Sequence, residues 1–134
     1  MKNSVPTDQK REGMSVLVVD DSPVIREKLL GAFLSAGFET CLEARNGKEA
    51  IDLARQFKPD VIMLDLSMPV MSGLEAAPVL RQVLPGTPII MFTLFAGGLS
   101  NTDVSKAGIS LVLEKSTPLA TLTDKAYELV RTHA

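Results

Sequence analysis

The sequence predicts an α/β protein in which a doubly wound parallel sheet of five strands is covered by five helices. Short apolar runs recur along the chain, segments with helical periodicity separate them, and charged or hydroxyl residues follow several of the runs. Runs that are apolar on both faces are typical of parallel strands covered by helices on both sides. Regular alternation of strands and helices implies right-handed crossovers, and therefore a doubly wound sheet.

The strands are expected at five short runs. Four of these runs are continuously apolar or nearly so, and the second is more mixed. They are SVLVV (15–19), FETCLEA (38–44), VIMLD (61–65), PIIMF (88–92) and SLVLE (110–114).

Helical segments lie between and after these runs. Apolar residues recur with the helical period in residues 23–36, 47–57 and 118–131. A further helix is expected to begin after Ser72, and Pro78 should kink or shorten it because proline lacks a backbone donor. Another helix, short and irregular, is expected to start near Ser100, after the pair Gly97-Gly98.

Local signals mark where these helices begin and end. A capping hydroxyl before proline, or a Ser or Asn with Glu three residues later, favours a helix start. The first pattern occurs at Ser22-Pro23 and Thr117-Pro118, and the second at Asn46 with Glu49 and Ser72 with Glu75. Helix ends are expected at Gly37, Gly86 and Gly108.

Composition bounds the class of protein. The chain has 134 residues, 46% of them hydrophobic, which is enough for one domain with a core, and residues 1–13 are expected to form a flexible tail before a domain at 14–134. A net charge of −2 without a basic run argues against direct binding of nucleic acid or a membrane. No stretch is long and apolar enough for a membrane span or an export signal, so a cytoplasmic protein is expected. The single Cys41 excludes an internal disulfide and is interpreted as a strand hydrophobe.

Chemically active side chains stand at the ends of the predicted strands. They are Asp20, Asp21, Asp65, Thr93 and Lys115. In a doubly wound sheet, ligands bind beyond the carboxyl ends of the strands, so these five side chains should meet at one edge. Each of them alone has a simpler interpretation as a helix cap, a strand hydroxyl or a solvated surface charge. The set in order favours a functional site.

The expected chemistry follows from charge. Adjacent carboxylates repel each other unless a cation lies between them, and an all-oxygen site without nearby Cys or His suits Mg²⁺. Lys115 adds a second positive charge, and Thr93 adds a small donor. A metal, an ammonium and a hydroxyl around a carboxylate can hold the oxygens of a transferring phosphoryl group, with Asp65 as the nucleophile.

These residues give the chain a resemblance to a known family. From Ser15 to Arg131 it resembles the receiver domain of two-component response regulators, through Asp20-Asp21, the stretch MLDLSMPVMSG around Asp65, and Thr93 and Lys115. The resemblance implies a flavodoxin-like sheet with strand order 2-1-3-4-5. It also implies that the domain signals through self-phosphorylation and self-dephosphorylation and is otherwise not an enzyme.

The resemblance assigns a role to each site residue. Asp65 would accept phosphate from a sensor histidine kinase or a histidine phosphotransfer protein, with Thr93 and Lys115 binding the phosphoryl oxygens. Mg²⁺ would be bound by the side chains of Asp21 and Asp65 and the backbone carbonyl of Ser67, with Asp20 acting mostly through water. Pro69 and Gly73 would shape the loop after the nucleophile. Phosphorylation would switch contacts with a downstream effector or a missing output domain, or drive formation of a homodimer.

The chain departs from the family pattern at several positions. Val112 stands where receivers usually carry a Tyr or Phe that swings inward on activation, and Ser116 stands where many have Pro. Leu94 is large where a small residue is favoured after Thr93, which suggests slow loss of phosphate. We therefore expect switching to involve reordering of residues 94–107, with Thr93 moving toward the phosphate.

Two other functional classes are considered. A Mg²⁺-dependent phosphohydrolase with an aspartyl-phosphate intermediate usually has a second Asp two residues after the nucleophile, where this chain has Ser67, and a capping domain for which the chain has no room. A degenerate receiver acting only as a protein-binding module should lack a site residue, yet all are present. The sequence does not decide between a stand-alone receiver and a piece of a longer protein.

Overall fold

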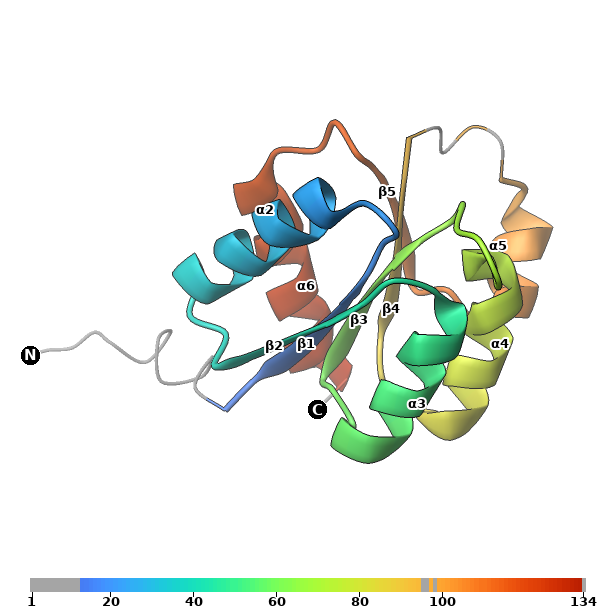
Figure 1. Ribbon diagram of the computed structural model, residues 1–134, viewed down its shortest axis with the longest axis horizontal. Coiled ribbons are helices and arrows are strands. Elements are labelled where there is room, and N and C mark those ends of the chain that lie inside the picture. The colour runs from blue at the N-terminus through green and yellow to red at the C-terminus, as the bar shows by residue number, and fades with distance from the viewer. Residues whose placement is uncertain (1–12, 95–96, 98, 134) are drawn as a thin grey trace, which may run out of the picture.

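The structure is a computed structural model that describes residues 13–94, 97 and 99–133. The predicted tail before Gly13 lies outside the described residues, as does Gly98 of the predicted glycine pair. Within the described part, strands and helices alternate in the predicted order (Figure 1).

Five parallel strands form one sheet in the order β2-β1-β3-β4-β5. They are β1 (Ser15–Val19), β2 (Thr40–Ala44), β3 (Val61–Asp65), β4 (Ile89–Thr93) and β5 (Leu111–Glu114). The strand order confirms the predicted flavodoxin-like topology. The second strand begins two residues later than predicted and the last two begin one residue later. The fourth also ends one residue later, which places Thr93 within the strand, opposite Glu114.

Five helices connect or follow the strands. They are α2 (Pro23–Ser35), α3 (Gly47–Phe57), α4 (Gly73–Val83), α5 (Asn101–Ala107) and α6 (Leu119–His133). The predicted caps Ser22, Asn46 and Ser72 each accept a hydrogen bond from a backbone N–H, and Ser100 does the same at the start of α5. Of the two predicted capping boxes, only the one between Ser72 and Glu75 is reciprocal, because Glu49 instead accepts from the N–H of Arg45.

Two layers of helices enclose the sheet. One hydrophobic cluster joins a face of the sheet to α2 and α6, with Leu29, Phe33 and Leu122 fully or almost fully buried. A second cluster joins the other face to α3, α4 and α5. Figure 1 shows the same division, with α2 and α6 on one side of the sheet and α3, α4 and α5 on the other. The central strands β1 and β3 are therefore buried on both faces, as their continuous apolar runs predicted.

Some local predictions differ from the structure. Helix α4 continues through Pro78 to Val83, because the loss of a single backbone donor leaves the other hydrogen bonds of the helix in place. Helix α4 also ends before Gly86, and α3 ends at Lys58 in a left-handed conformation, with φ 49°. Leu34 and Phe57, which share the periodic apolar positions of their helices, are about half exposed.

Cys41 lies in β2 as predicted, and its thiol is half buried. Burial raises the pKa of the Cys41 thiol, so the unreactive protonated form is favoured. A membrane-spanning helix would need more length and more apolar character than any helix in the described part of the chain has.

Candidate functional site

Three carboxylates meet at the carboxyl edge of the sheet. Asp20 directly follows β1, Asp21 is next in the chain, and Asp65 is the last residue of β3. Because β1 and β3 are neighbouring parallel strands, these ends lie side by side, and one oxygen from each carboxylate lies within 4.8 Å of the others. Asp20 and Asp65 are buried, whereas Asp21 is exposed and opens the cluster to solvent.

The side chain of Lys115 reaches this cluster from the end of β5. Its Nζ lies 2.9 Å from Oδ2 of Asp20 and 3.2 Å from Oδ1 of Asp65. Burial lowers the pKa of the Lys115 ammonium, but the ion pairs with the two carboxylates outweigh this effect and leave the pKa raised. In this structure, Lys115 is therefore a cation that lets two buried carboxylates lie close together.

The pKa of Asp65 differs from that of an ordinary exposed carboxylate. Burial and the neighbouring charge of Asp20 raise the pKa of Asp65, and Lys115 and the backbone N–H of Ser67 only partly offset them. A carboxylate held this way is incompletely neutralised by the protein alone. Added positive charge at the site would favour its ionised, nucleophilic form.

A tight loop between β3 and α4 follows Asp65. The N–H of Gly73 donates to the carbonyl of Leu66 at 2.9 Å, which brings the first residue of α4 against the end of β3. A Cβ on Gly73 would collide with the backbone carbonyl of Asp65, so the close approach requires glycine. In the same loop the N–H of Met71 donates to the carbonyl of Pro69, a γ-turn centred on Val70 with φ 71°.

Thr93 and Lys115 are joined through the backbone. The N–H of Lys115 donates to the carbonyl of Thr93 at 2.7 Å, so the ends of β4 and β5 are linked directly beside the site. Thr93 is buried at the carboxyl end of β4. Leu94, the next residue, has 81% of its surface exposed, and Val112 is half buried in β5 against the cluster that includes α4 and α5.

The donor set fits a hard divalent cation. It consists of carboxylate oxygens, and no cysteine or histidine is among the residues that converge there. Asp20 Oδ2 is buried, and among the described residues it accepts no hydrogen bond of acceptable geometry, although the ammonium of Lys115 is near. A buried carboxylate oxygen without a hydrogen bond, beside an exposed carboxylate, is consistent with a site for a hydrated cation such as Mg²⁺.

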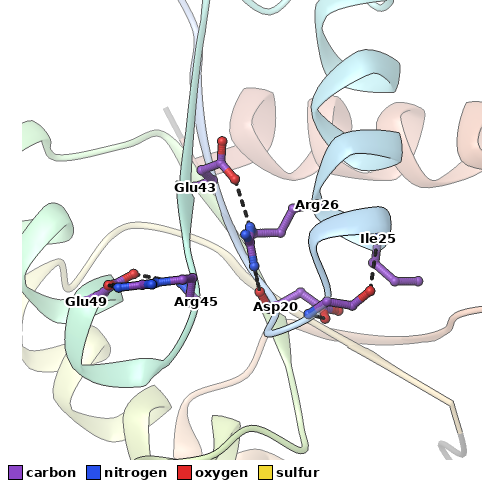
Figure 2. Close-up of polar contacts among 7 residues, drawn as sticks. Asp20, Ile25, Arg26, Glu43, Arg45 and Glu49 are labelled. Carbon is purple, nitrogen blue, oxygen red and sulfur yellow. Dashed lines mark hydrogen bonds and ion pairs between the residues drawn. The ribbon is translucent and has the colours of Figure 1, made fainter.

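Arg26 is a site neighbour that the sequence did not predict. Its Nη1 donates to the backbone carbonyl of Asp20 at 2.8 Å, and its Nε contacts Oε1 of Glu43 at 2.8 Å (Figure 2). A signal was present in the sequence. A cation near the start of a helix opposes the helix dipole, so it needs a nearby acceptor or acidic partner, and the first turn of α2 has no acidic residue.

Fold and site together define a class of protein. A doubly wound sheet of this order, with three carboxylates and a lysine at the carboxyl edge, is the architecture of a phosphoacceptor signalling domain. The chain belongs to the response regulator receiver domain family, whose model matches residues 16–127. This match confirms the resemblance inferred from the sequence, and it favours neither a phosphohydrolase nor a degenerate binding module.

Two individual relatives show the extent of the similarity. The chain is 33% identical over 96 residues to the chemotaxis protein CheY of Thermotoga maritima, a match that covers 72% of this chain and 80% of that protein. It is 38% identical over 121 residues to a protein-glutamate methylesterase/protein-glutamine glutaminase of Archaeoglobus fulgidus, covering 88% of this chain. The chain spans only 34% of the length of that methylesterase.

A solved structure gives the same picture. The chemotaxis protein CheY4 of Vibrio cholerae is similar in fold, with a TM-score of 0.78 and 31% sequence identity. The similarity covers 87% of this chain and 98% of that structure. The chain is thus a receiver domain similar to those of chemotaxis proteins, and its family is one of signalling proteins that bind Mg²⁺ at an acidic site.

Proposed function

We propose that Asp65 is the phosphorylated residue of this receiver, and that it takes its phosphoryl group from a sensor histidine kinase or a histidine phosphotransfer protein. The observation that carries the proposal is the meeting of three carboxylates and Lys115 at one edge of the sheet. Among these carboxylates, Asp65 combines burial, a raised pKa and a position at the end of the central strand β3.

In the proposed reaction an oxygen of Asp65 forms a bond to phosphorus while the P–N bond of a phosphohistidine breaks and the imidazole leaves. Lys115 then moves from the Asp65 carboxylate to a phosphoryl oxygen, which keeps its charge opposite an anion. Thr93 donates its hydroxyl to another phosphoryl oxygen. Both residues stand at the ends of neighbouring strands, on the same edge of the sheet as Asp65.

The acidic cluster is proposed to hold Mg²⁺. The carboxylates of Asp21 and Asp65 and the backbone carbonyl of Ser67 are the proposed ligands, with Asp20 acting through water. When bound, Mg²⁺ supplies positive charge that screens the carboxylates from one another and from the incoming phosphoryl group. The exposed position of Asp21 supports this assignment, because it leaves a solvent path for hydrated ions.

Phosphorylation is proposed to switch contacts with a downstream effector protein, or with an output domain, or to drive homodimer formation. The proposed switching segment is residues 94–107, since Val112 lacks an aromatic ring that could rotate inward; residues 95, 96 and 98 of this segment lie outside the described residues. Direct contact with nucleic acid or membrane is not part of the proposal, and the cytoplasm is its proposed location. Unchanged backbone amide NMR shifts in this segment on adding beryllofluoride with Mg²⁺ would contradict the proposed reordering.

The decisive experiment uses acetyl phosphate as donor. Incubation of the parent chain with acetyl phosphate and Mg²⁺ should add one phosphoryl group by intact mass, and the Asp65→Asn variant should add none. Omission of Mg²⁺ should abolish the addition. Native size-exclusion chromatography of the same samples tests for a dimer. A phosphoryl group on Asp65→Asn, or none on the parent, would contradict the proposed function.

A further inference from the structure

The peptide unit before Asp21 is held by Arg26. Its side chain donates from Nη1 to the carbonyl of Asp20 at 2.8 Å, and its own backbone N–H donates to the carbonyl of Ser22 at 3.0 Å. The N–H of Ser22 is also fixed, because it donates to Oδ1 of Asp20 at 2.9 Å. The peptide units before and after Asp21 therefore have defined positions.

This matters because the Asp21 side chain is exposed and cannot rely on packing for its direction. An exposed carboxylate is oriented chiefly by the backbone that carries it. Metal affinity depends on holding ligand atoms close to their bound positions, and outer partners that fix the ligands commonly set the affinity. Whatever fixes the Asp20–Asp21 peptide unit therefore helps to fix a proposed metal ligand.

The guanidinium of Arg26 is itself held in place. Its Nε contacts Oε1 of Glu43 at 2.8 Å, and Glu43 lies in β2, the strand paired with β1. Only 11% of the Arg26 side chain is exposed, whereas Glu43 is 53% exposed. Figure 2 shows the guanidinium lying between the carboxylate of Glu43 and the backbone of Asp20. The planar guanidinium can donate in two fixed directions at once, here to Glu43 and to the Asp20 carbonyl. The ammonium of a lysine does not have this geometry.

We infer that Arg26 is a positioning residue for the metal site, acting through the backbone of Asp20 to place the carboxylate of Asp21. This inference rests on the proposed binding of Mg²⁺ at the acidic cluster. It extends that proposal by naming a residue that touches neither the cation nor the phosphoryl group and still sets the affinity for the cation.

Charge and positioning predict opposite outcomes for removal of Arg26. A fixed positive charge near the cluster repels a dication, so its loss by electrostatics alone should tighten Mg²⁺ binding. Loss of a positioning contact should weaken the binding instead. The sign of the change therefore separates the two roles, and a purely structural role would change the melting temperature without changing the affinity of the folded chain.

The chain offers a matched control in Arg45. This arginine also pairs with a glutamate, through Nε and Nη2 to Oε2 of Glu49 at 3.1 and 2.7 Å, and it follows β2 just as Asp20 follows β1. Arg45 donates to none of the acidic-cluster residues in the hydrogen bonds of the described chain. Arg45→Gln removes the same charge without touching the Asp20 backbone.

The test is the dissociation constant for Mg²⁺, measured by titrating backbone amide NMR shifts of the metal-free chain. We expect Arg26→Gln to raise this constant about tenfold, the lower end of the range for outer-shell partners of a metal site. Arg45→Gln should leave it near the parent value. Arg26→Lys keeps the positive charge and loses the planar guanidinium, so any weakening of Mg²⁺ binding in this variant arises from geometry alone. If Arg26→Gln does not fold, Arg26→Lys takes its place in the test.

Melting of the metal-free variants is measured in parallel. An unchanged or lower dissociation constant in the folded Arg26 variants would overturn the inference, as would an equal rise in Arg45→Gln. The proposed function fails separately and visibly, because a parent chain without measurable Mg²⁺ binding contradicts the metal site itself. A parent that binds Mg²⁺ beside Arg26 variants that bind it equally well contradicts only the positioning role.

Discussion

Nζ of Lys115 lies 2.9 Å from Oδ2 of Asp20, so a residue at the end of the edge strand β5 neutralises a carboxylate at the end of the central strand β1. The same ammonium lies 3.2 Å from Asp65. Two strands that are not neighbours in the sheet are thus joined across the site by charge. A cation that binds the carboxylates must compete with this lysine.

The first prediction concerns Lys115→Met. Without the ammonium, two buried carboxylates lose their cation, and the metal-free chain should lose about 2 kcal/mol of unfolding free energy, less than for a fully enclosed pair. Because the lysine no longer competes for the same oxygens, Mg²⁺ should bind more tightly. Urea denaturation with and without Mg²⁺ measures both effects.

Lys28→Met is the control for this change. Lys28 lines a hollow beside Lys115, between α2 and the start of α6, and it is exposed. Its loss removes the same charge without an ion pair to the cluster. Equal destabilisation by the two variants would show that net charge, and not the contacts of Lys115, accounts for the effect.

The second prediction is a pH dependence caused by Asp65. The pKa of Asp65 is raised in the folded chain. At a pH between the ordinary aspartate pKa and this raised pKa, the folded state therefore holds a proton that the unfolded state has released. Stability from this group is complete below the ordinary aspartate pKa and is lost as pH rises through the folded pKa. Asp65→Asn should remove this step, and at neutral pH the variant should be more stable than the metal-free parent.

Urea denaturation of both chains from acidic to neutral pH measures the difference. The comparison isolates Asp65, because exposed carboxyls such as Glu49 and Glu75 have lowered pKa values and contribute the opposite slope equally to both chains. A difference between the chains that does not vary with pH would contradict the assigned direction of the shift.

The parts of the site that the sequence predicted share one property. Three of these residues, Asp20, Asp65 and Thr93, follow or end buried apolar runs. The end of a strand can be recognised in the sequence as the point where such a run stops. Once the alternation of strands and helices predicted a parallel sheet, the edge at which these residues meet was determined by topology. Even the one-residue shift of β4 left Thr93 at that edge.

Other features could not be predicted, because they depend on contacts between distant residues. Arg26 and Glu43 are 17 residues apart, so the position of Arg26 near a helix start indicates a need for an acceptor but does not identify Glu43 or the Asp20 carbonyl before α2 and β2 are placed in space. The left-handed conformations of Lys58 and Val70 carry no sequence signal, since neither residue type favours positive φ. These conformations are imposed by the closure of a helix end and of the loop after Asp65.

The third prediction compares two glycines. In Gly73→Ala the new Cβ meets the backbone of Asp65 and lies 3.1 Å from Cα of Leu66, so backbone must move. We expect a loss of about 2 kcal/mol in unfolding free energy, with slower phosphorylation by acetyl phosphate, because overpacking displaces the nucleophile. Chemical denaturation and intact mass measure the two effects.

Gly31→Ala is the matched substitution for Gly73→Ala. Gly31 lies within α2 with open space around its Cα, so alanine should gain about 0.5 to 1 kcal/mol from helix propensity. The phosphorylation rate should stay at the parent value. Similar stability in the two alanine variants would contradict the close approach between Gly73 and Asp65.

The fourth prediction concerns the strained turn at Val70. A β-branched residue at φ 71° is unfavourable, and Val70 is 77% exposed, so little packing is lost on truncation. Val70→Gly should raise the unfolding free energy by about 1 kcal/mol, because relief of strain exceeds the added entropy of the unfolded chain. Val24→Gly, at an exposed position with helical backbone in α2, should instead lower it by roughly 0.5 kcal/mol. Destabilisation by both substitutions would contradict strain at Val70.

The last prediction concerns Leu94, which follows Thr93 and has 81% of its surface exposed. So much exposure means that Leu94→Ala should change stability by less than about 0.5 kcal/mol. If movement of Thr93 toward the phosphoryl group carries Leu94 over Asp65, the leucine hinders attacking water, and its loss should speed dephosphorylation by up to about tenfold, or about 1.4 kcal/mol in the barrier. Decay of the phosphorylated mass after removal of acetyl phosphate measures the rate.

Leu119→Ala is the control for this change. It truncates a less exposed leucine that begins α6 and should leave the dephosphorylation rate unchanged. Equal lifetimes in Leu94→Ala and the parent would show that Leu94 does not cover Asp65 in the phosphorylated state.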